Sequence, residues 1–389
     1  MGAIRRWLPC CCGGGGGEEG GGKKGSVGDG LVWDVALKAH ASGDYSVAVA
    51  QANESLEDQA QVFVSPAATL VGVYDGHGGP EAARFVNKRL FSLIQEFAVE
   101  NGGMSAGVFE KAFGATEEEF VATVHKSWPS QPRILSVGSC CLVGAIDNGT
   151  LFVANLGDSR AVLGRRAGGK NKRVVAERLS RDHNVADETI RNELHEAHPD
   201  DPHIVLNTHG VWRIKGIIQV SRSIGDVYLK KPEICRSSPM LQQSICPFPL
   251  RRPVMSAVPS IKTRKLKPGD QFVIFASDGL WEQLTDEAAV AIVASSPRKG
   301  VAMRLVRAAQ LEAARKKDVK YERIRTIEKG YRRHFHDDIT VVVLFLDKCG
   351  RAGKGGGHGD DEIDGTDGPV DVFSLSSDEQ EDPTRPVLR

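Results

Sequence analysis

Six acidic residues of this chain stand beside short apolar runs, in places where they could bind a metal ion. They are Glu57, Asp58, Asp75, Asp278, Asp337 and Asp338. Asp75 and Asp278 each follow an apolar run and precede a glycine, so each would lie where a buried strand opens at the rim of a sheet. A single Asp-Gly pair is more often an ordinary turn than a metal ligand. Several such acids in one chain favour a shared site.

The chemistry of these acids points to a hard dication. No Cys-x-x-Cys or paired-His motif accompanies them, so the pattern favours Mg²⁺ or Mn²⁺ over Zn²⁺ or Cu²⁺. Two such ions about 3.5–4 Å apart can share a water, lower its pKa and direct the resulting hydroxide at a phosphorus atom. Cys246 and Arg252 have Cys-x5-Arg spacing, but the residues between them include two prolines and no glycine, so we expect direct attack by water rather than a covalent phosphoenzyme.

Short strands and separate long helices are expected to position these acids. The expected strands are residues 69–74, 141–146, 151–155, 161–164, 271–276 and 339–346. The expected helices are residues 80–99, 105–125, 187–196, 285–294 and 300–316. Between two of the strands, residues 147–150 contain Asn-Gly, which accepts the positive φ values of a tight hairpin turn. The pattern therefore indicates antiparallel sheet layers with helices outside them.

Five separated segments resemble, in order and spacing, the motifs of the metal-dependent type 2C protein serine/threonine phosphatases (the PPM family). The segments are Asp75-Gly-His-Gly-Gly79, Gly157-Asp-Ser-Arg160, Val220-Ser-Arg-Ser-Ile-Gly-Asp226, Ser277-Asp-Gly279 and Asp337-Asp-Ile-Thr340. The resemblance covers roughly residues 43–347, and residues 51–53, 198–201, 210–213 and 332–337 are similar in particular to the plant clade D members. It implies an α+β fold, a four-layer αββα sandwich of two antiparallel sheets, and an enzyme that hydrolyses phosphoserine and phosphothreonine.

The resemblance also implies a ligand set for two Mg²⁺ or Mn²⁺ ions. Asp75 would bridge the ions, the Gly76 carbonyl would bind one of them, and Asp278 and Asp337 would complete the other. Glu57 and Asp58 would act directly or through water.

Two further site residues follow from the resemblance. His77 would be a general acid at the leaving oxygen, which imidazole can be near neutral pH, although a structural role in a glycine turn stays open. Asp158 matches a position that many relatives use for a third, weaker metal. Glu282 stands where an Asp often assists that ion, so the third site is an open question.

The chain departs from the family pattern where relatives bind the substrate phosphate. Many relatives carry Arg at the position of Asn53, so another cation is needed here. The candidates in sequence are Arg84, Arg181, Arg213, Lys215 and Arg222. Asp338 replaces the usual Asn and would either raise metal affinity or face water.

Composition sets limits on partners and location. Lys+Arg and Asp+Glu are both 50, so the formal net charge is +0 and we expect no nucleic-acid binding. Residues 1–42 are expected to be a flexible segment, 43–347 the catalytic domain and 348–389 a disordered acidic tail. No apolar run is long enough to span a bilayer. We expect a monomer in the cytoplasm, the nucleus or both.

The N-terminus leaves a lipid-anchored plasma-membrane fraction open. Gly2 suits myristoylation, but Arg6 stands where Ser or Thr is preferred. Palmitoylation of Cys10, Cys11 or Cys12 beside two arginines would supply a second membrane signal. The alternative is an unmodified tail.

Two other functions stay open from the sequence. Asn53 motivates a catalytically impaired module that keeps the fold, and a hydrolase of small phosphoesters is also compatible with the acids. Residues 198–230 could recognise a peptide or could be a folded insertion with Trp212 packed inward. Phosphoproteins are the expected substrates. Similarity to clade D suggests a plasma-membrane proton pump as substrate and small auxin-up RNA proteins as inhibitors.

Overall fold

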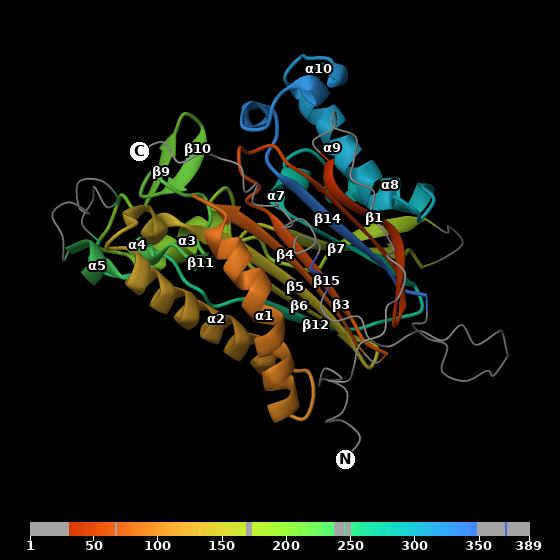
Figure 1. Ribbon diagram of the computed structural model, residues 1–389, viewed down its shortest axis with the longest axis horizontal. Helices are drawn as coiled ribbons and strands as arrows, with labels where there is room; N and C mark the ends of the chain where they lie inside the picture. Colours follow the sequence, from red (N-terminus) through yellow and green to blue (C-terminus); the bar gives the residue numbers. More distant parts are fainter. Residues whose placement is uncertain are drawn as a thin grey trace, which may run out of the picture.

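The fold is a sandwich of two antiparallel sheets with helices on both outer faces (Figure 1). The computed structural model describes residues 31–66, 68–168, 173–236, 245, 250–347 and 370–371. The first sheet has the order β1 (Leu31–His40), β2 (Gly43–Ala50), β14 (Ile339–Phe345), β13 (Asp270–Ala276), β7 (Arg160–Arg166), β8 (Val174–Arg178). The expected α+β sandwich is confirmed.

The second sheet carries three of the six predicted strands. Its order is β12 (Ser260–Lys265), β6 (Thr150–Leu156), β5 (Gly138–Asp147), β4 (Ala68–His77), β3 (Gln59–Val64), β15 (Val370–Asp371), and β11 (Ile224–Gly225) pairs with β5. A separate hairpin consists of β9 (Val205–Thr208) and β10 (Val211–Ile214). The predicted turn joins β5 to β6, with Asn148 and Gly149 both at positive φ.

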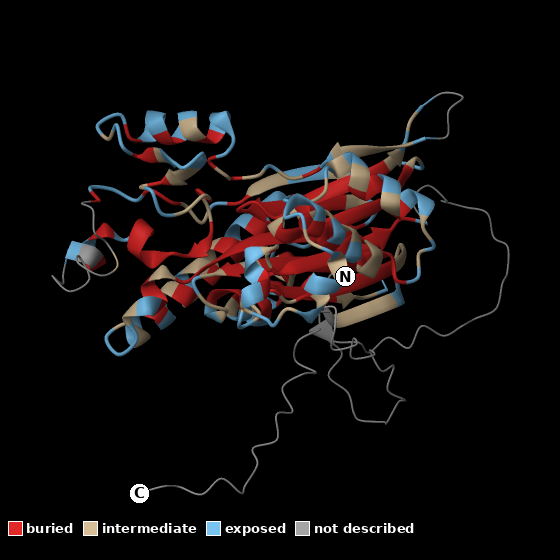
Figure 2. Ribbon diagram, turned by 90° about the horizontal axis from the view of Figure 1, so that it is seen from above, coloured by how far each residue is buried: buried red, intermediate tan, exposed pale blue. Residues whose placement is uncertain are grey.

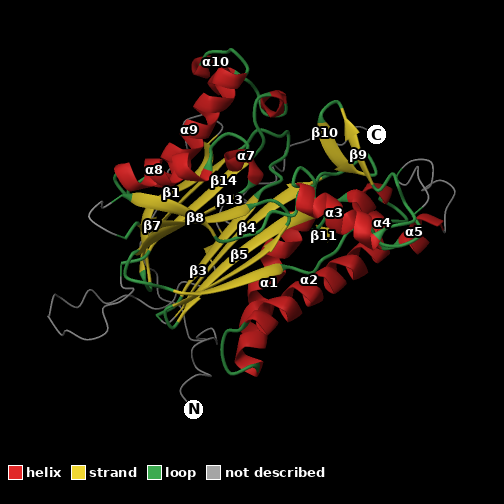
Figure 3. Cartoon of the chain, turned by 180° about the vertical axis from the view of Figure 1, so that it is seen from behind, coloured by secondary structure: helices red, strands yellow, loops and turns green. Residues whose placement is uncertain are grey.

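Helices cover the outer faces of both sheets. Helices α1 (Glu81–Glu100) and α2 (Ala106–Ser127) lie along the second sheet, and α8 (Asp286–Ser295) and α9 (Val301–Lys316) lie along the first (Figures 1 and 3). The shorter helices are α3 (Glu188–Ala197), α4 (Val227–Lys230), α5 (Pro232–Arg236), α7 (Asp278–Trp281), α10 (Tyr321–Thr326) and the 3-10 turns η2 (Pro132–Ser136) and η3 (Tyr331–His334). Within the described residues, no helix is both long and apolar enough to cross a bilayer.

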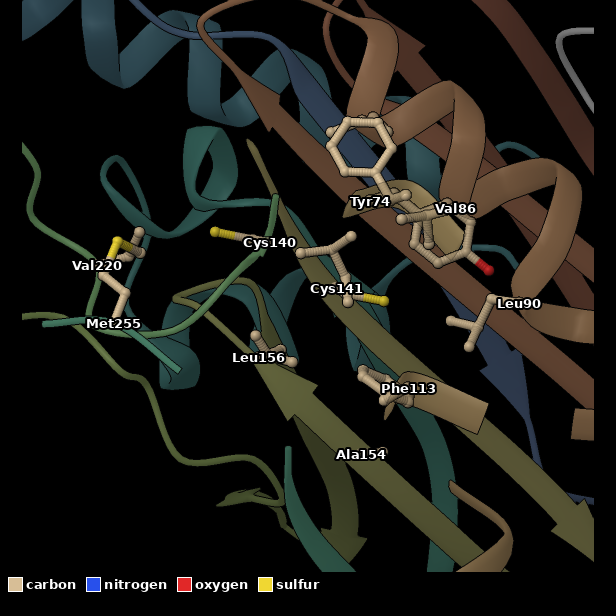
Figure 4. Packing of buried hydrophobic residues seen from close by; sticks show 14 of the residues in the cluster. Tyr74, Val86, Leu90, Phe113, Cys140, Cys141, Ala154, Leu156, Val220 and Met255 are labelled. Carbon is tan, nitrogen blue, oxygen red and sulfur yellow. The ribbon is translucent and has the colours of Figure 1, made fainter. Parts of the chain in front are cut away.

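Three hydrophobic clusters hold these four layers together, and Figure 2 shows the sheets as the most buried part of the molecule. Successive strand residues face opposite sides of a sheet, so one strand can feed two clusters. On β2, Val47 and Val49 pack between the sheets, whereas Ala48 and Ala50 face the α8–α9 layer. On β4, Tyr74 faces α1 and α2, together with Leu90, Phe113 and Cys141 (Figure 4). Burial on both faces therefore fixes the register of the central strands.

Two expectations about the chain course need correction. Residues 31–40, expected in the flexible N-terminal segment, form β1, because their backbone pairs with β2. The strand expected to end at Asp75 continues to His77, since Asp75 pairs with Cys140 and His77 with Gly138. Residues 1–30, with the expected lipid anchor, lie outside the described residues, as does the predicted acidic tail apart from β15.

Candidate metal centre and active site

A cavity of about 1000 Å³ opens at the end of the sandwich where loops from both sheets meet. Seven of the eight predicted site residues line it. They are Glu57, Asp75, Gly76, His77, Asp158, Asp278 and Asp337. The eighth, Asp58, is buried behind them.

Three carboxylates from distant parts of the chain converge in this cavity. Asp75 lies near the end of β4, Asp158 lies between β6 and β7, and Asp278 begins α7. One oxygen from each lies within 4.8 Å of the others. Asp278 Oδ1 is buried and, within the described residues, accepts no hydrogen bond. Asp158 accepts hydrogen bonds from Cys140 Sγ and Asn184 Nδ2, whereas Asp278 Oδ1 is left without a proton donor among those residues, as an oxygen that binds a hard dication would be.

The protein raises the pKa values of these acids. Burial raises the pKa of Asp75 well above its usual range, and the neighbouring charges of Asp58, Asp337 and Asp158 add to the effect. Burial, Asp75 and Asp158 do the same for Asp278. Like charges in a poorly solvated place repel each other, and a bound dication would relieve that repulsion. The residues present therefore fit the metal ions that the sequence predicts.

Asp337 and Glu57 line the same cavity as these three carboxylates. Asp337 is not one of the three carboxylates within 4.8 Å. Its Oδ1 accepts a hydrogen bond from Asn53 Nδ2 at 2.9 Å, and its Oδ2 lies 2.8 Å from the Arg333 guanidinium. Burial, followed by Asp338 and Asp337, raises the pKa of Glu57 to about 7. In this part of the cavity, the carboxylates of Glu57 and Asp337 are therefore accompanied by one close cation, Arg333.

Of the two roles expected for Asp338, the structure excludes that of facing water. Its side chain is buried, and its Oδ1 accepts hydrogen bonds from the backbone N–H groups of Ala52 and Asn53 at 2.7 and 3.0 Å. Its Oδ2 accepts one from the Glu57 N–H at 2.9 Å. A carboxylate that accepts several backbone hydrogen bonds fixes the conformation of the segment that donates them. Asp338 thus holds the loop that presents Glu57, and it does not face water.

Asp58 and two glycines bring the loops close together. Asp58 Oδ2 accepts a hydrogen bond from Ser277 Oγ at 2.8 Å, which ties the start of β3 to the residue before Asp278. A Cβ at Gly76 would lie 2.6 Å from the Glu57 carbonyl oxygen, and one at Gly279 would lie 2.1 Å from that of Asp338. Only glycine permits such close backbone approach.

His77 has a buried partner to which the sequence analysis gave no role. Its Nε2 lies 2.8 Å from Asp226 Oδ2, and Asp226 also accepts from Ser223 Oγ at 2.6 Å. Burial lowers the pKa of His77, but the Asp226 charge and hydrogen bond outweigh it, so the pKa is raised overall. Asp226 was part of a recognised motif, yet nothing in the sequence indicated that its carboxylate would meet His77.

The structure separates the candidate phosphate-binding cations. Of the five predicted, Arg181 and Arg213 line the cavity, whereas Arg84, Lys215 and Arg222 do not. Three arginines that the sequence analysis missed also line it, namely Arg160, Arg178 and Arg333. Arg160 and Arg178 are held by Asp182 and Asp286. Arg333 could have been suspected, because it stands four residues before Asp337.

The remaining expectations concern Glu282 and residues 198–230. Glu282 lines the cavity, and burial, followed by the Asp337 charge, raises its pKa. Part of residues 198–230 borders the cavity, including Arg213 and the stretch 217–220. Trp212 packs against the hydrophobic cluster under α1 and α2, with the Arg191 guanidinium 4.6 Å from its ring centroid. The segment thus combines an inward-packed tryptophan with a position at the rim.

Comparisons with known proteins agree with this site. The family model described as Protein phosphatase 2C matches residues 49–318. The chain is 86% identical to "Probable protein phosphatase 2C 29" of Oryza sativa subsp. japonica, over 100% of both chains. It is 60% identical to "Probable protein phosphatase 2C 63" of Arabidopsis thaliana, over 91% of this chain and 93% of the relative.

Solved structures show the same fold at low sequence identity. The serine-threonine phosphatase 2C from Toxoplasma gondii superposes with a TM-score of 0.59 at 16% identity, over 80% of this chain and 98% of that one. Such a likeness supports the fold, whereas the family rests on the sequence matches. The chain belongs to the protein phosphatase 2C family and is a serine/threonine protein phosphatase of the plant type.

Proposed function

We propose that this phosphatase depends on two hard dications, Mg²⁺ or Mn²⁺, and transfers the phosphoryl group directly to water. The observation that carries the proposal is the convergence of Asp75, Asp158 and Asp278 within 4.8 Å. When bound, the ions would supply an activated water and neutralise phosphoryl oxygens. Direct transfer is supported by Cys140, because burial raises the pKa of its thiol well above the usual range and makes it a poor nucleophile.

The proposed ligands would hold two ions, with Asp75 shared between them. Asp75 and the Gly76 carbonyl would serve one ion, and Asp75, Asp278 and Asp337 the other. Glu57 would act through water, because it lines the cavity outside the three-carboxylate group. Asp58 would act by holding Ser277, to which its carboxylate is bound. Asp158 and Glu282 would form a weaker third position.

His77 is the proposed general acid. Its imidazole lines the cavity, and the buried Asp226 carboxylate orients the ring and favours its protonated form. A protonated imidazole can deliver a proton to the leaving serine or threonine oxygen. A structural role for His77 is compatible with the same contact, because the hydrogen bond to Asp226 would position the imidazole ring in either case.

Arg333 is the proposed cation for the substrate phosphate. The other arginines of the cavity are bound to Asp182, Asp286 or Glu193 or, for Arg213, to a backbone carbonyl. Arg333 instead faces the metal ligand Asp337, and its side chain remains 51% exposed. Its charge interacts with Asp337, Asp278, Glu282 and Asp75, which together raise the pKa of the guanidinium. A planar guanidinium can bind two phosphate oxygens at once.

The alternative of a catalytically impaired module rested on the missing phosphate-binding arginine at Asn53. If Arg333 supplies that positive charge, the reason for this alternative disappears. Asn53 lacks a charge, but it supports Asp337 from the side opposite Arg333. The site therefore keeps a cation at the same carboxylate, from a different part of the chain.

Phosphate release from a phosphothreonine peptide tests the proposed function. The wild-type chain should release phosphate only with Mn²⁺ or Mg²⁺, and Asp75→Asn and Asp278→Asn should lose turnover while keeping the fold. Asp318→Asn, an exposed acid outside the cavity, is the matched control and should keep full activity. Metal-independent turnover by the wild type would refute the mechanism. Equal rates on nucleotides and phosphopeptides would favour the small-phosphoester alternative.

We also propose partners on the clade D resemblance alone. The substrate would be a phosphothreonine of a plasma-membrane proton pump, and small auxin-up RNA proteins would inhibit the enzyme. Phosphoproteomics after loss of the protein tests the first part. That phosphothreonine should accumulate, and an unchanged level would remove the pump from consideration.

A further inference from the structure

A second hollow adjoins the active-site cavity along the edges of the two sheets. It has a volume of about 330 Å³ and is lined by Arg178, Leu179, Ser180, Arg181, Ser260, Ile261 and Lys262. We call these residues the edge groove. Three of them, Arg178, Ser180 and Arg181, also line the main cavity, so the two hollows are neighbours. The groove lies between the end of β8 and the start of β12, which are terminal strands of the two sheets.

The edge groove is lined by cations and by no acid. Arg178 is paired with Asp286 and Arg181 with Glu193. Lys262 is exposed, and its ammonium donates a hydrogen bond to the Arg178 carbonyl at 3.0 Å. Within the described part of the chain it forms no ion pair. Lys262 is thus the one cation of the groove without an acidic partner among the described residues.

The positive charge continues behind the groove. The partly buried Arg222 donates a hydrogen bond to the Val258 carbonyl at 2.8 Å. Burial lowers the pKa of Arg222, the Glu193 charge opposes this shift, and repulsion from Arg181 adds a smaller lowering. His183, whose Nε2 lies 2.7 Å from the Ser260 hydroxyl of the groove, has its pKa lowered to about 3 by burial and then by Arg222 and Arg181. Arg181 and Arg222 thus place two positive charges near each other, and neighbouring cations attract an anion.

We propose that the edge groove binds an acidic side chain, Asp or Glu, that flanks the phosphorylated residue of the protein substrate. The inference rests on the proposed function, since the phosphorylated residue must occupy the adjoining cavity. An extended peptide advances about 3.3 Å per residue, so residues that flank the phosphorylated one can reach a hollow next to the active site. The two arginines already have acidic partners, and the single unpaired Lys262 matches the single charge of a carboxylate better than the double charge of a second phosphate.

The first test measures binding without hydrolysis. The full Mn²⁺-loaded chain is titrated into three labelled peptides that carry a non-hydrolysable phosphonate analogue of phosphothreonine. One peptide has neutral flanking residues, one has Asp on the amino-terminal side of the analogue, and one has Asp on the carboxy-terminal side. One Asp-flanked peptide should bind about fivefold to tenfold tighter than the neutral peptide, and the difference should shrink with NaCl. Equal affinities for all three peptides would overturn the proposal. Tighter binding of a phosphoserine-flanked peptide would overturn the choice of a carboxylate.

The second test uses kinetics with a matched pair of variants. Lys262→Glu reverses the unpaired charge, and Lys265→Glu changes an exposed lysine of the same strand that does not line the groove. Lys262→Glu should raise KM for the preferred Asp-flanked phosphopeptide by about fivefold or more and leave the neutral peptide within about twofold. Lys265→Glu should change neither, and equal effects of the two variants would refute a specific groove.

Hydrolysis of p-nitrophenyl phosphate separates this proposal from the proposed function. That substrate has no flanking residues, so Lys262→Glu should leave its rate unchanged. If no substrate is hydrolysed but the Asp-flanked phosphonate still binds through Lys262, the groove stands and the proposed function fails. If all substrates are hydrolysed without regard to flanking acids, the groove fails alone.

Discussion

At the scale of single residues, the site is organised around carboxylates that would repel one another in isolation. Asp75, Asp278 and Asp58 all have pKa values well above the usual range, first because of burial and then because of their acidic neighbours. The residue types and motifs predicted which acids would matter. They could not predict the hydrogen bonds that separate metal ligands from supporting acids. Asp338 is the example, because its role depends on where three N–H groups of the loop 52–57 lie.

Arg333 is predicted to bind the substrate phosphate. Arg333→Ala should lower kcat/KM on a phosphothreonine peptide by about tenfold to a hundredfold, because a charge-assisted bidentate contact is lost. Inhibition by inorganic phosphate should weaken in parallel, and that binding measurement does not depend on turnover. Arg333→Lys should recover only part of the loss. Arg323→Ala, an exposed arginine of α10 outside the cavity, is the control. Unchanged phosphate inhibition in Arg333→Ala would exclude this role.

Asp226 is predicted to position His77 and to keep it protonated. A general acid works below its pKa, and Asp226 raises the pKa of His77. Asp226→Asn should therefore move the alkaline limb of the kcat profile to lower pH and lower kcat by about tenfold or more. KM should change little, since the Asp226 side chain is buried and its carboxylate is held by His77 and Ser223. A reduced kcat with an unshifted pH limb would point to a purely structural role.

At the scale of elements, the sequence predicted strands and helices that have clear apolar patterns. The helix expected from Thr285 begins there because the Thr285 hydroxyl accepts a hydrogen bond from the Ala288 N–H at 3.2 Å. The strands β1, β2, β3, β8 and β12 were missed, and in β1, β8 and β12 most of the described side chains are exposed or only partly buried. Terminal strands of a sheet need only one neighbour, so their sequences show a weaker pattern. Two of these missed strands form the edge groove.

His183 joins the elements on that side of the site, and its pKa predicts a pH effect on stability. Its Nδ1 accepts a hydrogen bond from the Gly157 N–H, and its Nε2 contacts Ser260. The folded state lowers its pKa from 6.5 to about 3, so the unfolded state binds a proton first as pH falls. Its contribution is complete above about pH 6.5 and is lost below it, by up to about 1.4 kcal/mol per pH unit.

Denaturant unfolding of the wild type and of His183→Gln between pH 7 and pH 5 measures this contribution. The wild type should lose more unfolding free energy over that range than the variant, because glutamine keeps a polar side chain and does not titrate. Parallel curves for the two proteins would contradict the assigned pKa.

At the scale of the whole molecule, the sandwich explains how residues from 57 to 337 reach one cavity. Antiparallel strands of both sheets end at the same side, and their loops carry the site residues. The fold class could be predicted because hairpin signals and separated helices allow few layered arrangements. The hydrogen bond from Asn53 to Asp337 could not, since it joins residues far apart in the chain that only the packed sandwich brings together.

The N-terminal cysteines give a prediction for the whole chain in the cell. If Cys10, Cys11 and Cys12 are acylated, part of the protein should pellet with plasma membranes, and changing all three to Ser should move that part to the supernatant. Catalytic activity in solution should stay the same, because residues 43–347 hold the proposed catalytic domain. Identical partitioning of the two forms would remove the anchor.

The binding of Mn²⁺ to the full chain, measured by titration calorimetry, tests the central claim most directly. The wild type should bind two ions with a clear saturation point, and Asp278→Asn should lose at least one of them while Asp318→Asn keeps both. No saturable binding by the wild type, or equal binding by wild type and Asp278→Asn, would contradict a metal centre built from these acids.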